Sequence, residues 1–107
     1  MSFMSFLRKS ASDLSPVDFK MRLDGDPDAV LVDVRTLGEY KSGCIGEAEH
    51  IDYFSKDFKD RLEALPKDKN YYLYCHSGNR SRQAMNMLIS MGYTAYNLDG
   101  GIMRWPY

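Results

Sequence analysis

Two short apolar runs constrain the fold of this chain more than any other feature of its sequence. Residues 30–34 (VLVDV) and 71–74 (YYLY) are nearly continuous in apolar character. A strand with one face in water would instead alternate apolar and polar residues. Continuous runs are typical of parallel strands that are covered on both faces. The sequence therefore predicts an α/β domain with a mostly parallel central sheet and helices on both faces.

Helical patterns alternate with these strands. Ser15 can cap a helix that Pro16 opens, and Thr36 with Glu39 has the spacing of a capping box for a second, short helix that ends at Gly43. A third helix before Pro66 is predicted by apolar residues at helical spacing, which are Phe54, Phe58, Leu62 and Leu65. A fourth helix over residues 84–91 ends at Gly92, and a last strand covers residues 94–98. Gly100 and Gly101 then turn the chain into a closing segment, residues 102–105, and the apolar pair 44–45 is too short to assign.

Length and charge limit the classes of function. The 107 residues suit one domain, which we assign to residues 13–107, after an N-terminal tail of residues 1–12. A net charge of −1 gives no reason to expect nucleic acid or an anionic membrane as a partner. Serines interrupt the first apolar residues, unlike a secretory signal, and no run approaches the roughly 20 apolar residues of a membrane span.

The two cysteines, Cys44 and Cys75, are too few for a secreted disulfide framework. They also lack the CxxC or Cys/His spacing of a zinc site. We therefore expect free thiols in a cytoplasmic protein, with no metal and no cofactor.

Cys75 lies where an apolar strand gives way to a loop and then to a helical pattern. The loop and first helical residues are His76, Ser77, Gly78, Asn79, Arg80 and Ser81. Amides of such a loop, together with the positive end of the helix dipole, can lower a cysteine pKa from about 8.5 to roughly 3.5–7.5. Gly78 permits a strained backbone, Arg80 adds positive charge, and Ser81 stands at the expected N-cap. A packed structural cysteine is the alternative, but the joint placement of these residues favours a reactive thiol.

Several motifs, in order, resemble the rhodanese family. They are Asp33-Val34-Arg35, Glu39-Tyr40, Gly43-Cys44-Ile45, the loop from Cys75 to Ser81, and Leu98-Asp99-Gly100-Gly101 with Trp105. The resemblance extends from about residue 14 to residue 105. It implies a single rhodanese-like domain with a sheet of about five strands.

The resemblance also implies a sulfurtransferase. Cys75 would take a sulfane sulfur from a small anionic donor such as thiosulfate, or from a persulfide, and hold it as a persulfide. A thiophilic acceptor, which is cyanide, a thiol or a protein cysteine, would then remove the sulfur. Loop amides would stabilise the anion, and Arg80 with His76 would hold the donor.

Four further residues carry less definite expectations. Asp33 and Arg35 either brace the catalytic loop as an ion pair, or Asp33 only caps local backbone groups. Cys44 replaces a histidine that is usual in the family. It is either a resolving thiol for Cys75 or, as we favour, a small buried residue. Glu47 replaces a usual glycine, which affects the local turn.

Two other functions use similar parts. Related phosphatases and arsenate reductases carry a Cys-x5-Arg loop, whereas four residues separate Cys75 from Arg80 here, so the tighter loop favours sulfur. A non-catalytic rhodanese-like module for binding or redox sensing is the other alternative. The sequence leaves the oligomeric state open.

Overall fold

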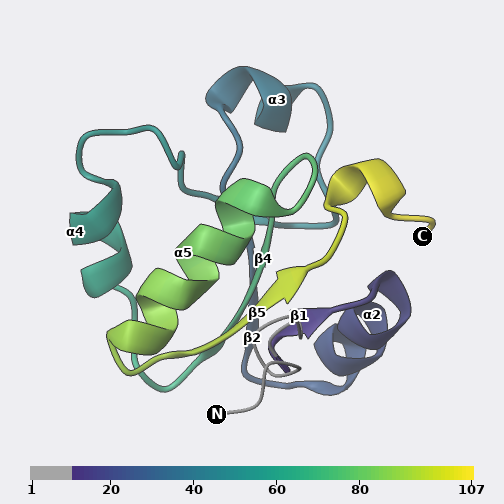
Figure 1. Cartoon of the computed structure of the whole chain (residues 1–107), viewed down its shortest axis with the longest axis horizontal. Helices are drawn as coiled ribbons and strands as arrows, with labels where there is room; N and C mark the ends of the chain where they lie inside the picture. The colour runs from purple at the N-terminus through teal and green to yellow at the C-terminus, as the bar shows by residue number, and fades with distance from the viewer. Residues whose placement is uncertain (1–10) are drawn as a thin grey trace, which may run out of the picture.

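A five-stranded sheet forms the centre of the protein (Figure 1). The computed structural model describes residues 11–107, and within this range all paired strands are parallel, in the order β1-β5-β4-β2-β3. The strands are β1 (Asp13–Leu14), β2 (Ala29–Asp33), β3 (Glu49–His50), β4 (Asn70–Tyr74) and β5 (Thr94–Leu98). The predicted α/β architecture with about five strands is confirmed.

Helices cover both faces of this sheet, as predicted. They are α2 (Pro16–Gly25), α3 (Leu37–Lys41), α4 (Phe58–Glu63), α5 (Asn79–Ser90) and the 3₁₀ helix η1 (Ile102–Arg104). Successive side chains of β4 point to opposite faces of the sheet, so they divide the core into two clusters. Tyr71 and Leu73 pack with α4 and α5, whereas Tyr72 and Tyr74 pack with α2 and the segment around η1. Figure 1 shows α4 and α5 on the opposite side of the sheet from α2.

Two helix starts form as their sequences predict. The Ser15 hydroxyl accepts a hydrogen bond from the Asp18 amide at 3.2 Å and caps α2. Thr36 and Glu39 form a complete capping box at the start of α3. Gly43, with φ of 140°, follows shortly after the end of that helix, as expected of a terminating glycine.

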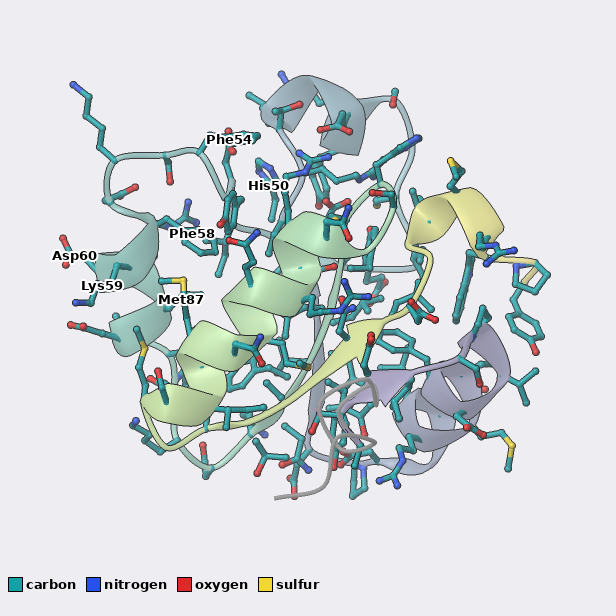
Figure 2. The ribbon with its side chains drawn as sticks, in the orientation of Figure 1. His50, Phe54, Phe58, Lys59, Asp60 and Met87 are labelled. Atoms are coloured by element: carbon teal, nitrogen blue, oxygen red, sulfur yellow. The ribbon has the colours of Figure 1, made fainter. Side chains whose placement is uncertain are left out.

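The helix before Pro66 is shorter than its apolar spacing predicts. It begins only at Phe58, and Phe54 lies in the preceding loop with 66% of its surface exposed (Figure 2). The Asp52 carboxylate accepts a hydrogen bond from the Phe54 amide at 2.8 Å. This local bond holds the loop in a turn that competes with a helix.

The apolar pair 44–45 forms no strand. Cys44 is exposed, and the amide of buried Ile45 donates to the Tyr74 hydroxyl at 2.9 Å. Gly46 makes the following turn with φ of 50°, so the exposed Glu47 does not need a glycine's conformation. The edge strand β3 starts after this turn.

Of the predicted N-terminal tail, residues 1–10 lie outside the described part of the chain. The Ser12 carbonyl accepts a hydrogen bond from the Asn97 amide of β5 at 2.8 Å. Among residues 11–107, no helix is long and apolar enough to cross a membrane.

Candidate active site

Cys75 directly follows the central strand β4, at the carboxyl edge of the parallel sheet. The chain then turns through three residues and enters α5 at Asn79. In open parallel α/β sheets, this edge is where ligands bind. The topology thus places one thiol between the end of a strand and the start of a twelve-residue helix.

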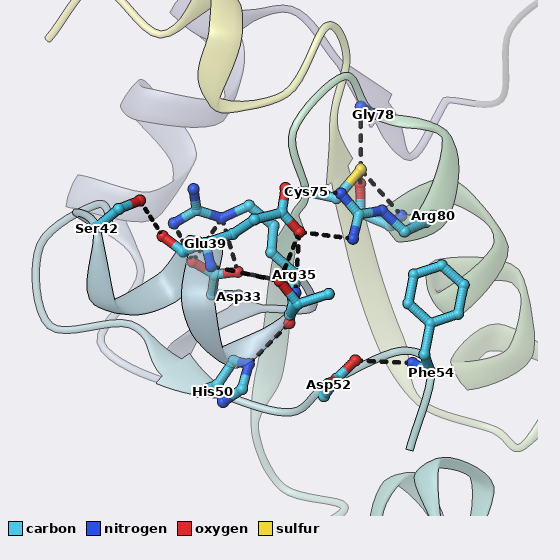
Figure 3. Close-up of polar contacts among 12 residues, drawn as sticks. Asp33, Arg35, Glu39, Ser42, His50, Asp52, Phe54, Cys75, Gly78 and Arg80 are labelled. Atoms are coloured by element: carbon cyan, nitrogen blue, oxygen red, sulfur yellow. Dashed lines mark hydrogen bonds and ion pairs between the residues drawn. The ribbon is translucent and has the colours of Figure 1, made fainter. Parts of the chain in front are cut away.

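Donors at the start of α5 surround the Cys75 sulfur. The Gly78 amide lies 3.1 Å from Sγ (Figure 3). The Ser81 amide lies 3.5 Å from Sγ and the Ser81 hydroxyl 3.3 Å. Cys75 is only 1% exposed, so these contacts form in a nearly dry environment. We call Cys75, Gly78 and Ser81 the cradle.

The cradle favours the thiolate form of Cys75. Burial raises the pKa of the thiol, but hydrogen bonds from the Ser81 hydroxyl and from the Ser81, Gly78 and Ser77 amides oppose it. The net effect places the pKa of Cys75 below its ordinary value.

The predicted N-cap role of Ser81 is wrong. Gly78 occupies the N-cap of α5, with φ of 102°, and its lack of a side chain leaves the helix without a side-chain cap. Ser81 is a buried residue of the first turn of α5, and its hydroxyl donates a hydrogen bond to Cys75 Sγ instead. The sulfur therefore accepts hydrogen bonds at the helix terminus where a capping oxygen usually would.

The segment after β5 holds the Cys75 loop through backbone hydrogen bonds. The Ile102 amide donates to the Cys75 carbonyl at 2.9 Å, and the Met103 amide donates to the His76 carbonyl at 3.1 Å. Gly101, with φ of 66°, is required for this approach, because a Cβ atom there would lie 2.3 Å from the His76 carbonyl oxygen. The sequence showed this glycine as part of a turn but did not show what it touches.

Asn97 of β5 is a second support that sequence reasoning missed. Its buried side-chain amide donates to the Gly78 carbonyl at 3.2 Å and to Asp13 Oδ1 at 2.7 Å. An asparagine inside a strand carries no signal of such a role.

Arg80 is paired before any ligand arrives. Its two terminal nitrogens lie 3.0 and 3.1 Å from the two carboxylate oxygens of Glu39 (Figure 3). The ring of Phe54 lies on another side, with its centroid 5.6 Å from Cζ. Hydrogen bonding to Arg80 lowers the pKa of Glu39 to about 2.

Asp33 and Arg35 form the predicted ion pair, with 2.7 Å between Oδ2 and Nη2. Asp33 also accepts from the Arg35 backbone amide at 2.9 Å, the local capping contact that was its alternative role. Arg35 Nη2 then donates to the Gly43 carbonyl at 2.6 Å. The pair therefore anchors the loop that carries Cys44.

The remaining loop side chains face outward. His76, Ser77 and Asn79 are exposed, and Asn79 Oδ1 accepts from Arg82 at 3.2 Å. Their side chains make none of the hydrogen bonds that hold the sulfur.

Cys44 is not the small buried residue that we expected. It is an exposed free thiol, and its sulfur lies 3.6 Å from the Gly46 carbonyl. The loop is exposed on both sides of the inward-pointing Ile45, which takes the core position instead. Within residues 11–107, no group of three or more His, Cys, Asp or Glu side chains is arranged to hold a metal ion.

Comparisons with known proteins agree with this geometry. A sulfurtransferase of Allochromatium vinosum is 35% identical over 88% of this chain and 87% of its own length. The thiosulfate sulfurtransferase GlpE of Pseudomonas fluorescens is 36% identical over 72% of this chain and 70% of its own. A crystal structure of a rhodanese-like domain protein from Staphylococcus aureus superposes with a TM-score of 0.76, at 30% identity, over 88% of this chain and 90% of that one.

These relatives support a sulfurtransferase of the rhodanese type. The sequence model of the rhodanese-like domain family matches residues 15–106. This span includes every strand except β1, and it includes the cradle. With a thiol loop between β4 and α5 in that span, the chain belongs to the rhodanese-like domain family.

Proposed function

We propose that this protein transfers a sulfane sulfur from a donor such as thiosulfate or a persulfide to a thiophilic acceptor, through a persulfide on Cys75. The observation that carries the proposal is the cradle. A buried sulfur accepts hydrogen bonds from the amides of Gly78 and Ser81 and from the Ser81 hydroxyl. Such an arrangement favours an attacking thiolate and supports a second anionic sulfur bonded to it.

The reaction has two steps. The Cys75 thiolate attacks the outer sulfur of thiosulfate, the S–S bond breaks, and its electron pair leaves with sulfite, so that Cys75–S–S⁻ remains. In the second step, cyanide or a thiolate attacks the outer sulfur of this persulfide. The new S–S bond breaks, the acceptor carries the sulfur away, and the Cys75 thiolate is restored. The two steps predict ping-pong kinetics.

The surrounding residues have distinct proposed roles. The amides of Ser77 and Gly78 stabilise the persulfide anion, and the exposed side chains of His76, Ser77 and Asn79 meet the donor at the surface. The buried pair of Asp33 and Arg35 supports the neighbouring loop.

Intact-protein mass spectrometry tests the proposal. The reduced protein, incubated with thiosulfate or with hydroxyethyl persulfide and then desalted, should gain the mass of one sulfur atom and lose it again on addition of cyanide. Cys75→Ser should gain none. Cys44→Ser is the matched control, because it removes the exposed thiol and should still gain one sulfur.

Two results would contradict sulfur transfer. If the wild-type protein gains no sulfur from either donor, the chain acts as a non-catalytic rhodanese-like module. If it instead releases phosphate from an aryl phosphate in a manner that depends on Cys75, the phosphatase alternative holds.

A further inference from the structure

The positive charge nearest to the cradle is already neutralised. Arg80 meets Glu39 in a two-pronged ion pair, and the side chains of the pair are only 22% and 32% exposed. Bidentate geometry of this kind is the strong form of an arginine–carboxylate interaction. Hydrogen bonding to Glu39 raises the pKa of Arg80, and the charge of Cys75 and a hydrogen bond to it add to this effect, so the guanidinium lies next to the sulfur as well as the carboxylate.

Glu39 is also held in place independently of Arg80. Its Oε1 accepts from the Thr36 amide at 3.0 Å and from the Thr36 hydroxyl at 3.1 Å, while its own amide donates to that hydroxyl. The capping box of α3 thus orients the carboxylate before it meets Arg80. A carboxylate with a pKa of about 2 is ionised at neutral pH.

Neighbouring arginines are paired in the same way. Arg82 contacts Asp13 at 3.1 Å and Asp99 at 3.3 Å. Arg35 is bound to Asp33. These guanidinium charges therefore leave little net positive field at the mouth of the cradle, which is the opposite of what a dianionic donor requires.

An apolar side chain lies beside this neutral pair. Phe54, 66% exposed, places its ring against the Arg80 guanidinium. An organic group can lose water against such a ring, whereas a sulfonate-like oxyanion gains nothing from it.

We propose that Glu39 is a specificity-determining residue that makes the mouth of the cradle neutral, so that the enzyme prefers organic persulfides, which carry at most one negative charge, to the dianion thiosulfate as sulfur donors. The inference rests on the proposed function of Cys75. With an organic persulfide R–S–SH, the Cys75 thiolate attacks the outer sulfur and the S–S bond breaks. The electron pair of this bond leaves with the R–S⁻ group, and Cys75–S–SH remains. The leaving group R–S⁻ carries one negative charge. Sulfite, which leaves from thiosulfate, carries two, so the Glu39 carboxylate repels it more strongly.

Glu39→Gln is the principal test. Glutamine keeps one oxygen for the capping box and for Arg80 Nη1, removes the negative charge, and replaces the oxygen that accepts from Arg80 Nη2 with an NH2 group. The measurement is kcat/KM, with KM and kcat separated, for thiosulfate and for hydroxyethyl persulfide with cyanide as acceptor. We expect kcat/KM for thiosulfate to rise roughly tenfold, mainly through KM, and to fall again with added salt. The value for hydroxyethyl persulfide should change by less than about twofold.

Asp24→Asn is the matched control. It removes a carboxylate from the exposed ion pair of Lys20 and Asp24 on α2, so the net charge changes equally, away from the cradle. Both donors should react as with the wild type. If Asp24→Asn also raises kcat/KM for thiosulfate tenfold, net charge alone controls donor choice and the assignment of Glu39 is wrong.

Arg80→Gln and the double variant with Glu39→Gln make the test independent of any one substitution. Arg80→Gln leaves the carboxylate uncompensated, so the ratio of thiosulfate to persulfide efficiency should fall below that of the wild type. The double variant restores neutrality and should return this ratio toward the wild-type value. If its ratio stays as low as in Arg80→Gln, Arg80 itself binds the anion and the proposal is overturned.

The remaining outcomes are distinguishable. A wild-type protein that gains no sulfur from any donor refutes the proposed function itself. A wild-type protein that gains sulfur but uses thiosulfate at least as well as hydroxyethyl persulfide refutes only the role of Glu39. Equal losses with both donors in Glu39→Gln would show a positioning role and no selectivity.

Discussion

The two cysteines of this protein are both free, yet they lie in opposite environments. Cys75 is 1% exposed, and three donors from the start of α5 point at its sulfur. Cys44 is exposed on a loop, and its sulfur faces a carbonyl oxygen, which cannot stabilise a thiolate. The thiol that is open to solvent lacks the donors, and the thiol that has the donors is hidden.

This difference indicates that hydrogen bonding, rather than exposure, favours the thiolate form of Cys75. Burial by itself raises the pKa of a thiol, so a hidden cysteine is usually inert. At Cys75 the surrounding donors outweigh burial and lower the pKa. Removing donors or displacing the loop should therefore make Cys75 less reactive even as it becomes more open.

The largest effect is expected from Gly101→Ala. The new Cβ would lie 2.3 Å from the His76 carbonyl oxygen and 2.6 Å from that of Cys75, at a φ of 66° that alanine rarely adopts. The loop must move, and the cradle with it. Sulfur loading of Cys75, followed by mass spectrometry, should slow by roughly a hundredfold, as when an anion-stabilising donor is lost.

Gly25→Ala is the control for this change, because a Cβ at Gly25 meets no atom within 4 Å. It should leave the loading rate unchanged. Normal loading in Gly101→Ala would mean that the loop does not depend on its contact with the segment around η1.

A smaller effect is expected from Ser81→Ala, which removes the hydroxyl donor at 3.3 Å from the sulfur. The pKa of Cys75 should rise, because this hydrogen bond favours the thiolate. The pH profile of Cys75 alkylation by iodoacetamide should move upward by about one unit. The exposed Cys44 provides an internal reference in the same sample.

Ser90→Ala, in the last turn of the same helix, removes a hydroxyl that bonds to the Met87 carbonyl and should leave both profiles in place. If the Cys75 profile is unchanged in Ser81→Ala, the hydroxyl of Ser81 does not stabilise the thiolate and the backbone donors do so alone.

The smallest effect concerns Glu39 of α3. Glu39 has a pKa of about 2 against an ordinary 4.5, so its ion pair contributes stability that is fully present above pH 4.5 and is lost as the pH falls through about 2. Wild type should be more stable than Glu39→Gln by about 1 kcal/mol at pH 6. Urea unfolding at pH 6, 4 and 3 should show this difference shrinking. A constant difference would refute the ionic contribution.

The sequence predicted most reliably those elements that local patterns determine. The strand at 94–98 has the predicted bounds, and the capping box of Thr36 and Glu39 forms because its two residues are three positions apart. The apolar spacing of Phe54 with Phe58 failed, because a side-chain turn at Asp52 holds the intervening backbone. The apolar periodicity of a sequence shows which residues can face the core, but it does not show which side chains form competing hydrogen bonds with the backbone.

The position of Cys75 between a strand and a helix was predicted from the sequence, and its partners less well. Cys75 and Gly78 could be found because strand, loop and helix are consecutive in the chain. Arg80 and Glu39 are 41 residues apart, so only the fold brings them together. The same holds for Asn97, which reaches the Gly78 carbonyl from the neighbouring strand.

The contact of η1 with the Cys75 loop has a consequence for synthesis. The amides that hold the carbonyls of Cys75 and His76 belong to Ile102 and Met103, which leave the ribosome well after the cysteine itself. During that interval the bonds that hold the Cys75 loop are missing. We therefore expect the nascent chain to carry Cys75 as an ordinary thiol until residues 101–103 join the folded domain.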